Sequence, residues 1–345
     1  MDHATGSGCG VATLEFRLRD PDRSLAGVRL VHHVVGIDRV DFSYAAGERA
    51  WHLRVPRPAL WRLEYLLELR HPDGRTETIP DPDNPHRVGG AFGDKSVLSC
   101  PEYHEPDWLH RPARPGTWRE LAIPVPGLGA TLTARIRSPG PPSRRILVAH
   151  DGPEYDRLAA LAHYSAAADV PPHHLVLLDP GERNEWYSAN PAYARALVTE
   201  VLPRVYAAIG TAGPVVGMGA SLGALAMLHA QRRHPDSFAG LFLQSGSFFL
   251  PRFDRHESGF RRYLRIVRFV GGVGRGAGTG RPVPAVLTCG LAEENLANNR
   301  EMSRTLAAQG YPVRLAEVPD AHNYTCWRDA FDPGLTELLK QVWHA

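Results

Sequence analysis

A serine between small residues is the strongest chemical signal in this chain. The sequence GASLG at 219–223 follows an apolar run at 214–216 and precedes a helical pattern at 224–231. A G-x-S-x-G sequence between a strand and a helix forms a strained turn that admits almost no side chain at its flanking positions and lifts the hydroxyl above the sheet. A glycine-rich turn that merely contains serine is the alternative, but the flanking strand and helix favour Ser221 as a nucleophile.

A serine hydroxyl is a weak nucleophile at its ordinary pKa and needs a base. Where this turn carries the nucleophile, its partners follow in the chain order serine, acid, histidine. His322 lies in the loop 319–324, directly after the last expected strand. Loops at the carboxyl ends of parallel strands build the sites of such sheets, so we predict His322 as the base rather than as a structural loop histidine. The later histidines not expected to act are His229, His234, His256 and His344.

The acid that orients the histidine should follow the preceding strand. Glu293 and Glu294 lie just after the strand pattern that ends near residue 290. Either carboxylate could orient the imidazole and stabilise its charged form, or could instead cap the next helix. Asp320 is a rival, but it stands two residues from His322, so the backbone would have to fold back sharply. We prefer Glu293 and keep Glu294 as the alternative.

Acyl transfer also requires backbone donors for the oxyanion that develops on the carbonyl. One should be the N–H of Leu222, directly after the nucleophile. The second should come from the loop after the strand at 146–149. Pro153 has no N–H, so Gly152 or Glu154 must supply it.

The elements that carry these residues form an alternating pattern. An antiparallel pair at 119–123 and 131–136 comes first, and strand patterns then alternate with helical stretches such as 191–209 and 298–308. The alternation predicts a mostly parallel sheet with helices on both faces. The strands expected in it are 146–149, 175–178, 215–217, 241–243, 286–288 and 313–317.

The first part of the chain has a different sequence pattern, that of short β-strands. Apolar and charged residues alternate at 14–18, and further strand patterns lie at 28–35, 51–55 and 63–69. Short strands separated by turn signals predict an Ig- or E-set-like β-sandwich. Proline-rich connectors follow at 80–85 and 101–116. We therefore expect a β-sandwich domain with its connector over 1–112 and an α/β domain over 113–345.

The bulk composition excludes several classes of function. The chain has 345 residues with a net charge of +2 from 39 basic and 37 acidic residues, so neither nucleic acid nor an anionic membrane is an expected partner. No apolar run approaches the length of a membrane span, and residues 1–6 lack the features of a secretory leader. The glycine-dense segment 271–280 is expected to be a loop and lacks the context of a nucleotide site. No cofactor is expected.

The four cysteines give no indication of a metal or redox site. Cys9, Cys100, Cys289 and Cys326 show no C-x-x-C spacing, so no zinc or redox motif, and no metal, is predicted. Four scattered thiols fit a reducing compartment, although the sequence also allows a bridge. We expect a cytoplasmic protein.

Several motifs together resemble one known family. They are His150-Asp151-Gly152 with Tyr155, the run Arg183, Glu185, Asn190, Glu200, Leu202 and Pro203, the turn at 219–223, Gln244-Ser245-Gly246-Ser247, and His322 followed by Trp327-Arg328. On these motifs, and on the run at 81–85, the chain resembles the enterochelin esterase (Fes-like) family of the esterase D group of α/β-hydrolases. Pro153 and Phe248-Phe249 depart from the family pattern.

The resemblance implies a serine esterase that cleaves the ester bonds of a ferric siderophore of the catecholate trilactone (enterobactin) type. It implies substrate contacts for Asp151 and Tyr155, although Asp151 could equally be a turn residue. Arg183 could bind an anionic edge of the substrate or pair with Glu185 or Glu200. The partner is a small-molecule ester, and no oligomeric state is predicted.

Two other functions remain open at this point. One is a general carboxylic-ester esterase of acyl or feruloyl type within the same group. The other is a non-catalytic binding protein in which the sandwich recognises a glycan. The intact G-x-S-x-G turn and His322 count against the second.

Overall fold

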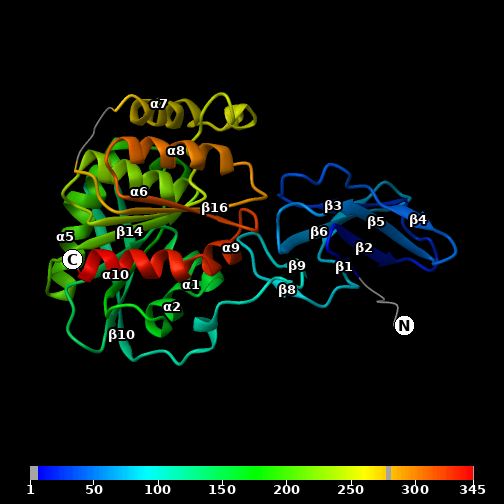
Figure 1. The fold of residues 1–345 in the computed structure, drawn as a ribbon, viewed down its shortest axis with the longest axis horizontal. Coiled ribbons are helices and arrows are strands. Elements are labelled where there is room, and N and C mark those ends of the chain that lie inside the picture. Colours follow the sequence, from blue (N-terminus) through cyan, green and yellow to red (C-terminus); the bar gives the residue numbers. More distant parts are fainter. Residues whose placement is uncertain (1–6, 277–280, 345) are drawn as a thin grey trace. The chain divides into compact units, whose positions relative to one another are not determined.

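The computed structural model describes residues 7–276 and 281–344, and contacts divide the chain into two compact units (Figure 1). The first unit comprises the chain up to His104 together with Gly290–Glu294 and Val318–Cys326. The second comprises Glu105–Cys289, Asn295–Glu317 and the chain from Trp327. Two short segments from late in the sequence therefore belong to the β-rich first unit.

The first unit is built from two antiparallel sheets, as the sandwich prediction expected. Their strand orders are β1-β2-β5-β4 and β3-β6-β9-β8, with β7 added beside β6. Leu14, Phe16 and Leu18 on β2 are buried while Glu15 faces out, because successive side chains point to opposite faces of a sheet. The strands are β1 (Gly8–Cys9), β2 (Thr13–Arg19), β3 (Gly27–Val31), β4 (Ser43–Ala45), β5 (Ala50–Pro56), β6 (Arg62–Arg70), β7 (Thr76–Ile79), β8 (Arg87–Val88) and β9 (Lys95–Ser99).

The proline-rich run at 80–85, which was expected to be a connector, is part of this unit. The buried Asp81 carboxylate accepts a hydrogen bond of 2.7 Å from the Tyr65 hydroxyl. The Asn84 amide donates to the Val97 carbonyl at 2.8 Å. Buried polar side chains need such partners, so the run is anchored to the sheets by its Asp and Asn.

The second unit contains one eight-stranded sheet in the order β10-β11-β13-β12-β14-β15-β16-β17. The pairs from β12–β13 through β15–β16 are parallel, and β10–β11 and β11–β13 are antiparallel. The central strands are fully buried, as expected for a sheet covered on both faces. The strands are β10 (Gly116–Val125), β11 (Ala130–Pro139), β12 (Ile146–Ala149), β13 (His174–Leu178), β14 (Val215–Ala220), β15 (Gly240–Gln244), β16 (Ala285–Gly290) and β17 (Val313–Val318).

Helices cover both faces of this sheet, with α6, α7 and α8 on one side and α1, α2 and α10 on the other (Figure 1). The stretch predicted at 191–209 is continuous, because a π-helical turn (Leu197–Val201) joins α4 to α5. The helices are α1 (Gly152–Ala159), α2 (Leu161–Ala167), α3 (Arg183–Trp186), α4 (Pro191–Ala196), α5 (Leu202–Ile209), α6 (Leu222–Arg233), α7 (Tyr263–Gly274), α8 (Leu296–Ala308), α9 (Tyr324–Asp329) and α10 (Thr336–His344).

Two expectations from the sequence are corrected here. The glycine-dense segment begins as helix, because α7 continues to Gly274, where Val270 and Val273 are buried against the core. Residues 277–280 of the predicted loop lie outside the described residues. In addition, Cys9 and Cys100 form a disulfide, so the cysteines are not four reduced thiols.

Among the described residues, no helix has both the length and the apolarity needed to cross a bilayer.

Candidate active site

Ser221 sits at the sharp turn between β14 and α6, as the G-x-S-x-G sequence predicts. Its backbone has φ 56° and ψ −123°, a conformation that costs energy for a residue with a side chain and that marks functional turns. A Cβ at Gly219 would lie 2.6 Å from the carbonyl carbon of Gly223. Glycine is therefore required where the strand and the helix approach each other most closely.

The segment after β15 contacts Ser221, the predicted nucleophile. The Ser221 N–H donates to the Gln244 carbonyl at 2.9 Å, and the Ser247 N–H donates to the Ser221 carbonyl at 3.1 Å. The hydroxyl oxygens of Ser221 and Ser247 lie 3.1 Å apart. This segment carries one of the motifs of the family resemblance, but nothing in the local sequence shows that the Ser247 hydroxyl lies beside that of Ser221.

The two expected oxyanion donors each begin a helix. Leu222 is the first residue of α6 and Gly152 is the first residue of α1. The first N–H groups of a helix have no partner within it and carry its positive dipole end, so they suit a developing oxyanion. A Cβ at Gly152 would lie 2.5 Å from the Leu177 backbone, so this position requires glycine. The amide of Glu154 belongs to the same first turn.

Asp151 and Arg183 form an ion pair beside this loop. Arg183 Nε and one Nη donate to the two Asp151 carboxylate oxygens at 2.8 and 2.9 Å. The Asp151 side chain is 4 % exposed and that of Arg183 is 34 % exposed. The partners expected for Arg183 were Glu185 and Glu200 rather than Asp151. Glu185 pairs instead with Arg262 and Arg265, and a Glu200 carboxylate oxygen accepts from the Gly127 N–H at 3.5 Å.

Asp151 is also the residue whose backbone turns into α1, with φ 50°. The left-handed conformation is uncommon for a residue with a side chain, and it is stabilised here by the surrounding contacts. The bidentate pair with Arg183 is such a contact. Asp151 is therefore a turn residue at the start of α1, and its predicted contact with substrate stays a prediction.

Two buried aromatic side chains, those of His150 and Tyr155, lie on either side of Asp151 in the sequence. His150 Nδ1 is 3.0 Å from the Gly223 carbonyl and its Nε2 is 2.9 Å from the Tyr193 hydroxyl. Burial lowers the pKa of His150 to about 4, so the imidazole is neutral at pH 7 and links the end of β12 to the helix after Ser221. Tyr155 is fully buried, and its hydroxyl donates to Gln244 at 2.8 Å. This burial and hydrogen bond give Tyr155 a packing contact with β15, and its predicted contact with substrate stays a prediction.

The proposed acid and base contact each other within the first unit. His322 Nδ1 lies 2.6 Å from Glu293 Oε2, and Glu293 Oε1 accepts from the Gly290 N–H at 2.6 Å. The Glu293 side chain is 1 % exposed. A carboxylate at Nδ1 fixes the tautomer that carries a proton there and leaves Nε2 as the acceptor, the arrangement a general base needs.

The other two acid candidates have different surroundings. Glu294 is exposed on the surface. Asp320 is buried and binds Arg62 through its Oδ2 at 3.2 Å. Arg62, on β6 of the first unit, was not recognised as a site residue, because nothing in the local sequence connects it with a loop 258 positions later.

The structure thus describes two parts of the predicted site separately. Ser221, Leu222 and Gly152 belong to the second unit, and Glu293 and His322 belong to the first. Along the chain, Ser221 follows β14, Glu293 follows β16 and His322 follows β17.

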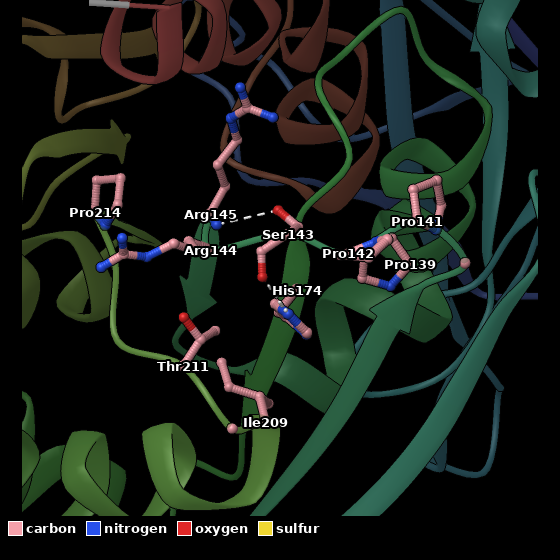
Figure 2. A pocket seen from close by; sticks show the side chains of 12 residues that line it. Pro139, Pro141, Pro142, Ser143, Arg144, Arg145, His174, Ile209, Thr211 and Pro214 are labelled. Carbon is pink, nitrogen blue, oxygen red and sulfur yellow. Dashed lines mark hydrogen bonds between the residues drawn. The ribbon is translucent and has the colours of Figure 1, made fainter.

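A pocket of about 900 Å³ elsewhere in the second unit is not suited to this chemistry (Figure 2). It is lined by residues 139–145 from the end of β11 to just before β12, including Arg144 and Arg145, by His174 at the start of β13, and by residues 209–211 and Pro214 from the end of α5 to just before β14. Ser221 follows the opposite end of β14. The two guanidinium groups donate to the carbonyls of Ala212 and Trp343, so they stabilise the main chain there.

Comparison with known proteins identifies relatives along most of the chain. Residues 128–338 match the family described as "Putative esterase". An iron(III) enterobactin esterase of Escherichia coli is 25 % identical over 342 residues, covering 87 % of this chain and 82 % of the relative. The crystal structure of the enterochelin esterase from Shigella flexneri matches with a TM-score of 0.74 at 21 % identity, over 98 % of this chain and 95 % of that one.

A further structural match covers less of the chain. A ferulic acid esterase superposes with a TM-score of 0.54 at 16 % identity, over 66 % of this chain and 98 % of its own. The resemblance to the enterochelin esterases that the motifs indicated is confirmed, and so is the fold of a β domain followed by an α/β-hydrolase domain.

Proposed function

Because this chain belongs to the esterase family and is a carboxylic ester hydrolase, we propose that it cleaves a ferric catecholate trilactone through an acyl-enzyme on Ser221. His322 is the general base and Glu293 is the acid that orients it. The contact of 2.6 Å between Glu293 and His322 carries this proposal, because it gives the imidazole the tautomer that accepts a proton at Nε2.

The chemistry proceeds in two steps. His322 Nε2 takes the proton of the Ser221 hydroxyl as its oxygen bonds to the ester carbonyl carbon, and the oxyanion accepts hydrogen bonds from the amides of Leu222 and Gly152. The carbon–oxygen bond to the alcohol then breaks, and His322 returns the proton to that leaving oxygen. Water, deprotonated by the same histidine, attacks the acyl-enzyme and releases the acid and free Ser221.

The substrate class is inferred from the extent of the likeness. The iron(III) enterobactin esterase of Escherichia coli aligns with 87 % of this chain, so the alignment includes part of the β-rich first unit as well as the hydrolase unit. The ferulic acid esterase aligns with 66 %. A relative that shares both units is the better guide to a substrate than one that shares a single unit. The iron is cargo of the substrate in this account.

We propose the cytoplasm as the compartment, where a ferric siderophore would release its iron after cleavage. The Cys9–Cys100 disulfide favours an oxidising compartment instead. Alkylation of thiols in intact cells, followed by mass spectrometry, measures whether this pair is bridged in place. A reduced pair supports the cytoplasm, and a bridged pair contradicts it.

A substrate panel tests the assignment. The purified protein is incubated with ferric enterobactin, p-nitrophenyl acetate and methyl ferulate, and products are followed by chromatography. We expect the trilactone to give the highest kcat/KM, and Ser221→Ala and His322→Ala to abolish its turnover. Ser237→Ala, a change at a half-buried bend between α6 and β15 of the same unit, serves as the matched control.

Each result of the panel has a definite meaning. Turnover of the simple esters with an intact trilactone would make the protein a general esterase. Absence of turnover on every ester, with the protein folded, would favour a binding protein. Retained turnover in the Ser221→Ala protein would exclude the mechanism.

A further inference from the structure

We propose that Arg62, on strand β6 of the first unit, is a positioning residue for His322, an inference that rests on the proposed function. Arg62 is 2 % exposed. A buried guanidinium is costly unless it is fully paired, so its partners show why it is present.

Those partners lie on both sides of His322 in the sequence. Arg62 Nε donates to Asp320 Oδ2 at 3.2 Å, and one Nη donates to Asn323 Oδ1 at 2.8 Å. The neighbouring Trp61 N–H donates to the Pro319 carbonyl at 2.7 Å. Trp61 and Arg62, at the start of β6, therefore bind the histidine loop on both sides of His322 in the sequence.

The loop also closes on itself around these contacts. Asp320 Oδ1 accepts from the Ala321 N–H at 2.7 Å and from the Asn323 side-chain amide at 2.9 Å. Asn323 Oδ1 accepts from the Cys326 N–H at 2.8 Å. A segment without a strand or helix of its own thus takes its conformation from a hydrogen-bonded ring in which Arg62 bridges the two side chains.

The charge on Arg62 is permanent. Burial lowers its pKa, but Asp320 and Glu64 outweigh burial and hold the pKa above its ordinary value. Glu64 also accepts from the Arg62 guanidinium at 2.8 Å and lies 3.7 Å from Lys95. Two basic and two acidic side chains therefore lie together in this cluster, where burial raises the pKa of Asp320 and the Arg62 charge opposes that rise.

The first unit holds the acid loop as well. The Val35 N–H donates to the Ala292 carbonyl at 2.9 Å, next to Glu293. The contact between Glu293 and His322 is formed by two loops that are both bound by this unit. We therefore assign to the β-rich unit the orientation of the general base, a role that affects kcat rather than substrate affinity.

The test compares two conservative changes on one strand. Arg62→Lys keeps the charge but loses the planar fork that reaches Asp320 and Asn323 together. Arg70→Lys changes an arginine on the same strand that is 43 % exposed and pairs with Glu68. Full-length proteins are assayed for kcat and KM on the best ester of the panel, for the rate of fluorophosphonate labelling, and for the unfolding temperature.

We expect Arg62→Lys to lower kcat and the labelling rate by about ten- to a hundredfold, because a small displacement of the base is enough for such a loss. KM should stay within about twofold, since the interaction concerns the transition state. Arg70→Lys should match the parent in every measurement. If Arg62→Lys does not fold, Asn323→Ala, which removes one accepting side chain of the loop, should lower kcat in the same direction.

The outcomes separate this inference from the function it rests on. Parent kcat and labelling rate in a folded Arg62→Lys or Asn323→Ala protein would overturn the positioning role and leave the esterase intact. A parent that turns over no ester and does not label would overturn both. A rise in KM at constant kcat would contradict positioning of the base and indicate a substrate contact.

Discussion

Glu293 Oε2 lies 2.6 Å from His322 Nδ1, while the other carboxylate oxygen of Glu293 accepts from the Gly290 N–H at 2.6 Å. Both oxygens of a buried carboxylate are thus occupied, and its orientation is fixed. Such a group stabilises the imidazolium that forms when the histidine takes a proton. The neighbouring Glu294, the alternative acid by sequence, is exposed.

The two adjacent glutamates give a matched pair of variants. Glu293→Gln should lower kcat about a hundred- to ten-thousandfold, because the amide can hold the imidazole in the wrong tautomer. Glu294→Gln should leave kcat within about twofold, as expected for an exposed position. Steady-state kinetics on the best ester compares them. Equal losses in the two proteins, or the larger loss in Glu294→Gln, would reassign the acid.

The ion pair between Arg183 and Asp151 distinguishes loop support from substrate binding. Because Arg183 binds Asp151 at the start of α1, Arg183→Gln should lower kcat about tenfold on neutral and anionic esters alike, through a displaced oxyanion donor. Asp151→Asn should have a similar effect, and the exposed Arg195→Gln should have none. A rise in KM confined to the anionic siderophore would instead make Arg183 a substrate contact.

The Ser247 hydroxyl oxygen lies 3.1 Å from Oγ of Ser221, the proposed nucleophile. Loss of one such hydrogen bond should lower kcat by about two- to tenfold in Ser247→Ala, with KM nearly constant. Pre-steady-state measurement of the acylation rate checks whether the loss occurs in the first chemical step. An unchanged acylation rate would show that the contact has no role in activating Ser221.

Stability should decrease in mild acid because three histidines of the second unit are buried. Burial is the main cause that lowers the pKa of His150 and His173 to about 4 and of His229 to about 3, against an ordinary value of 6.5. Between about pH 6.5 and 4 the unfolded chain therefore binds protons that the folded chain does not. The unfolding free energy should fall with pH in this window, by about 1.4 kcal/mol per pH unit for each such histidine.

Urea unfolding at pH 7.5, 6 and 5 measures this slope. His229→Leu replaces a histidine that packs edge-on against Phe269 and should flatten the slope by the contribution of one group. A parent whose unfolding free energy is constant across this range would contradict the linkage.

The central parallel strands of the second unit, β12 to β16, were predictable because they are buried on both faces and are largely apolar. The strand at 146–149 has the predicted bounds, and the other parallel strands differ at their ends by a few residues. Short edge strands such as β7 and β8 were missed, because partly exposed strands of two to four residues have no clear apolar pattern. Helix α7 was missed at its end because its last turn is rich in glycine.

The candidate site likewise contains some residues that the sequence predicts and others that it does not. The turn at Ser221 carries a local signature, since glycine is required at fixed offsets, and the sequence located it. The choice between Glu293 and Glu294 depends on a contact with His322, which is distant in the sequence. The local sequence does not show which glutamate makes this contact. Arg62 is remote in sequence from the loop it binds, so only a folded chain identifies it.

The covalent step on Ser221 is the central claim, and intact-protein mass spectrometry after exposure to a fluorophosphonate tests it most directly. The account predicts one adduct on the parent, mapped to Ser221 by peptide analysis, no adduct on Ser221→Ala, and markedly slower labelling of His322→Ala. An unmodified parent, or a Ser221→Ala protein that is labelled as fast as the parent, would contradict it.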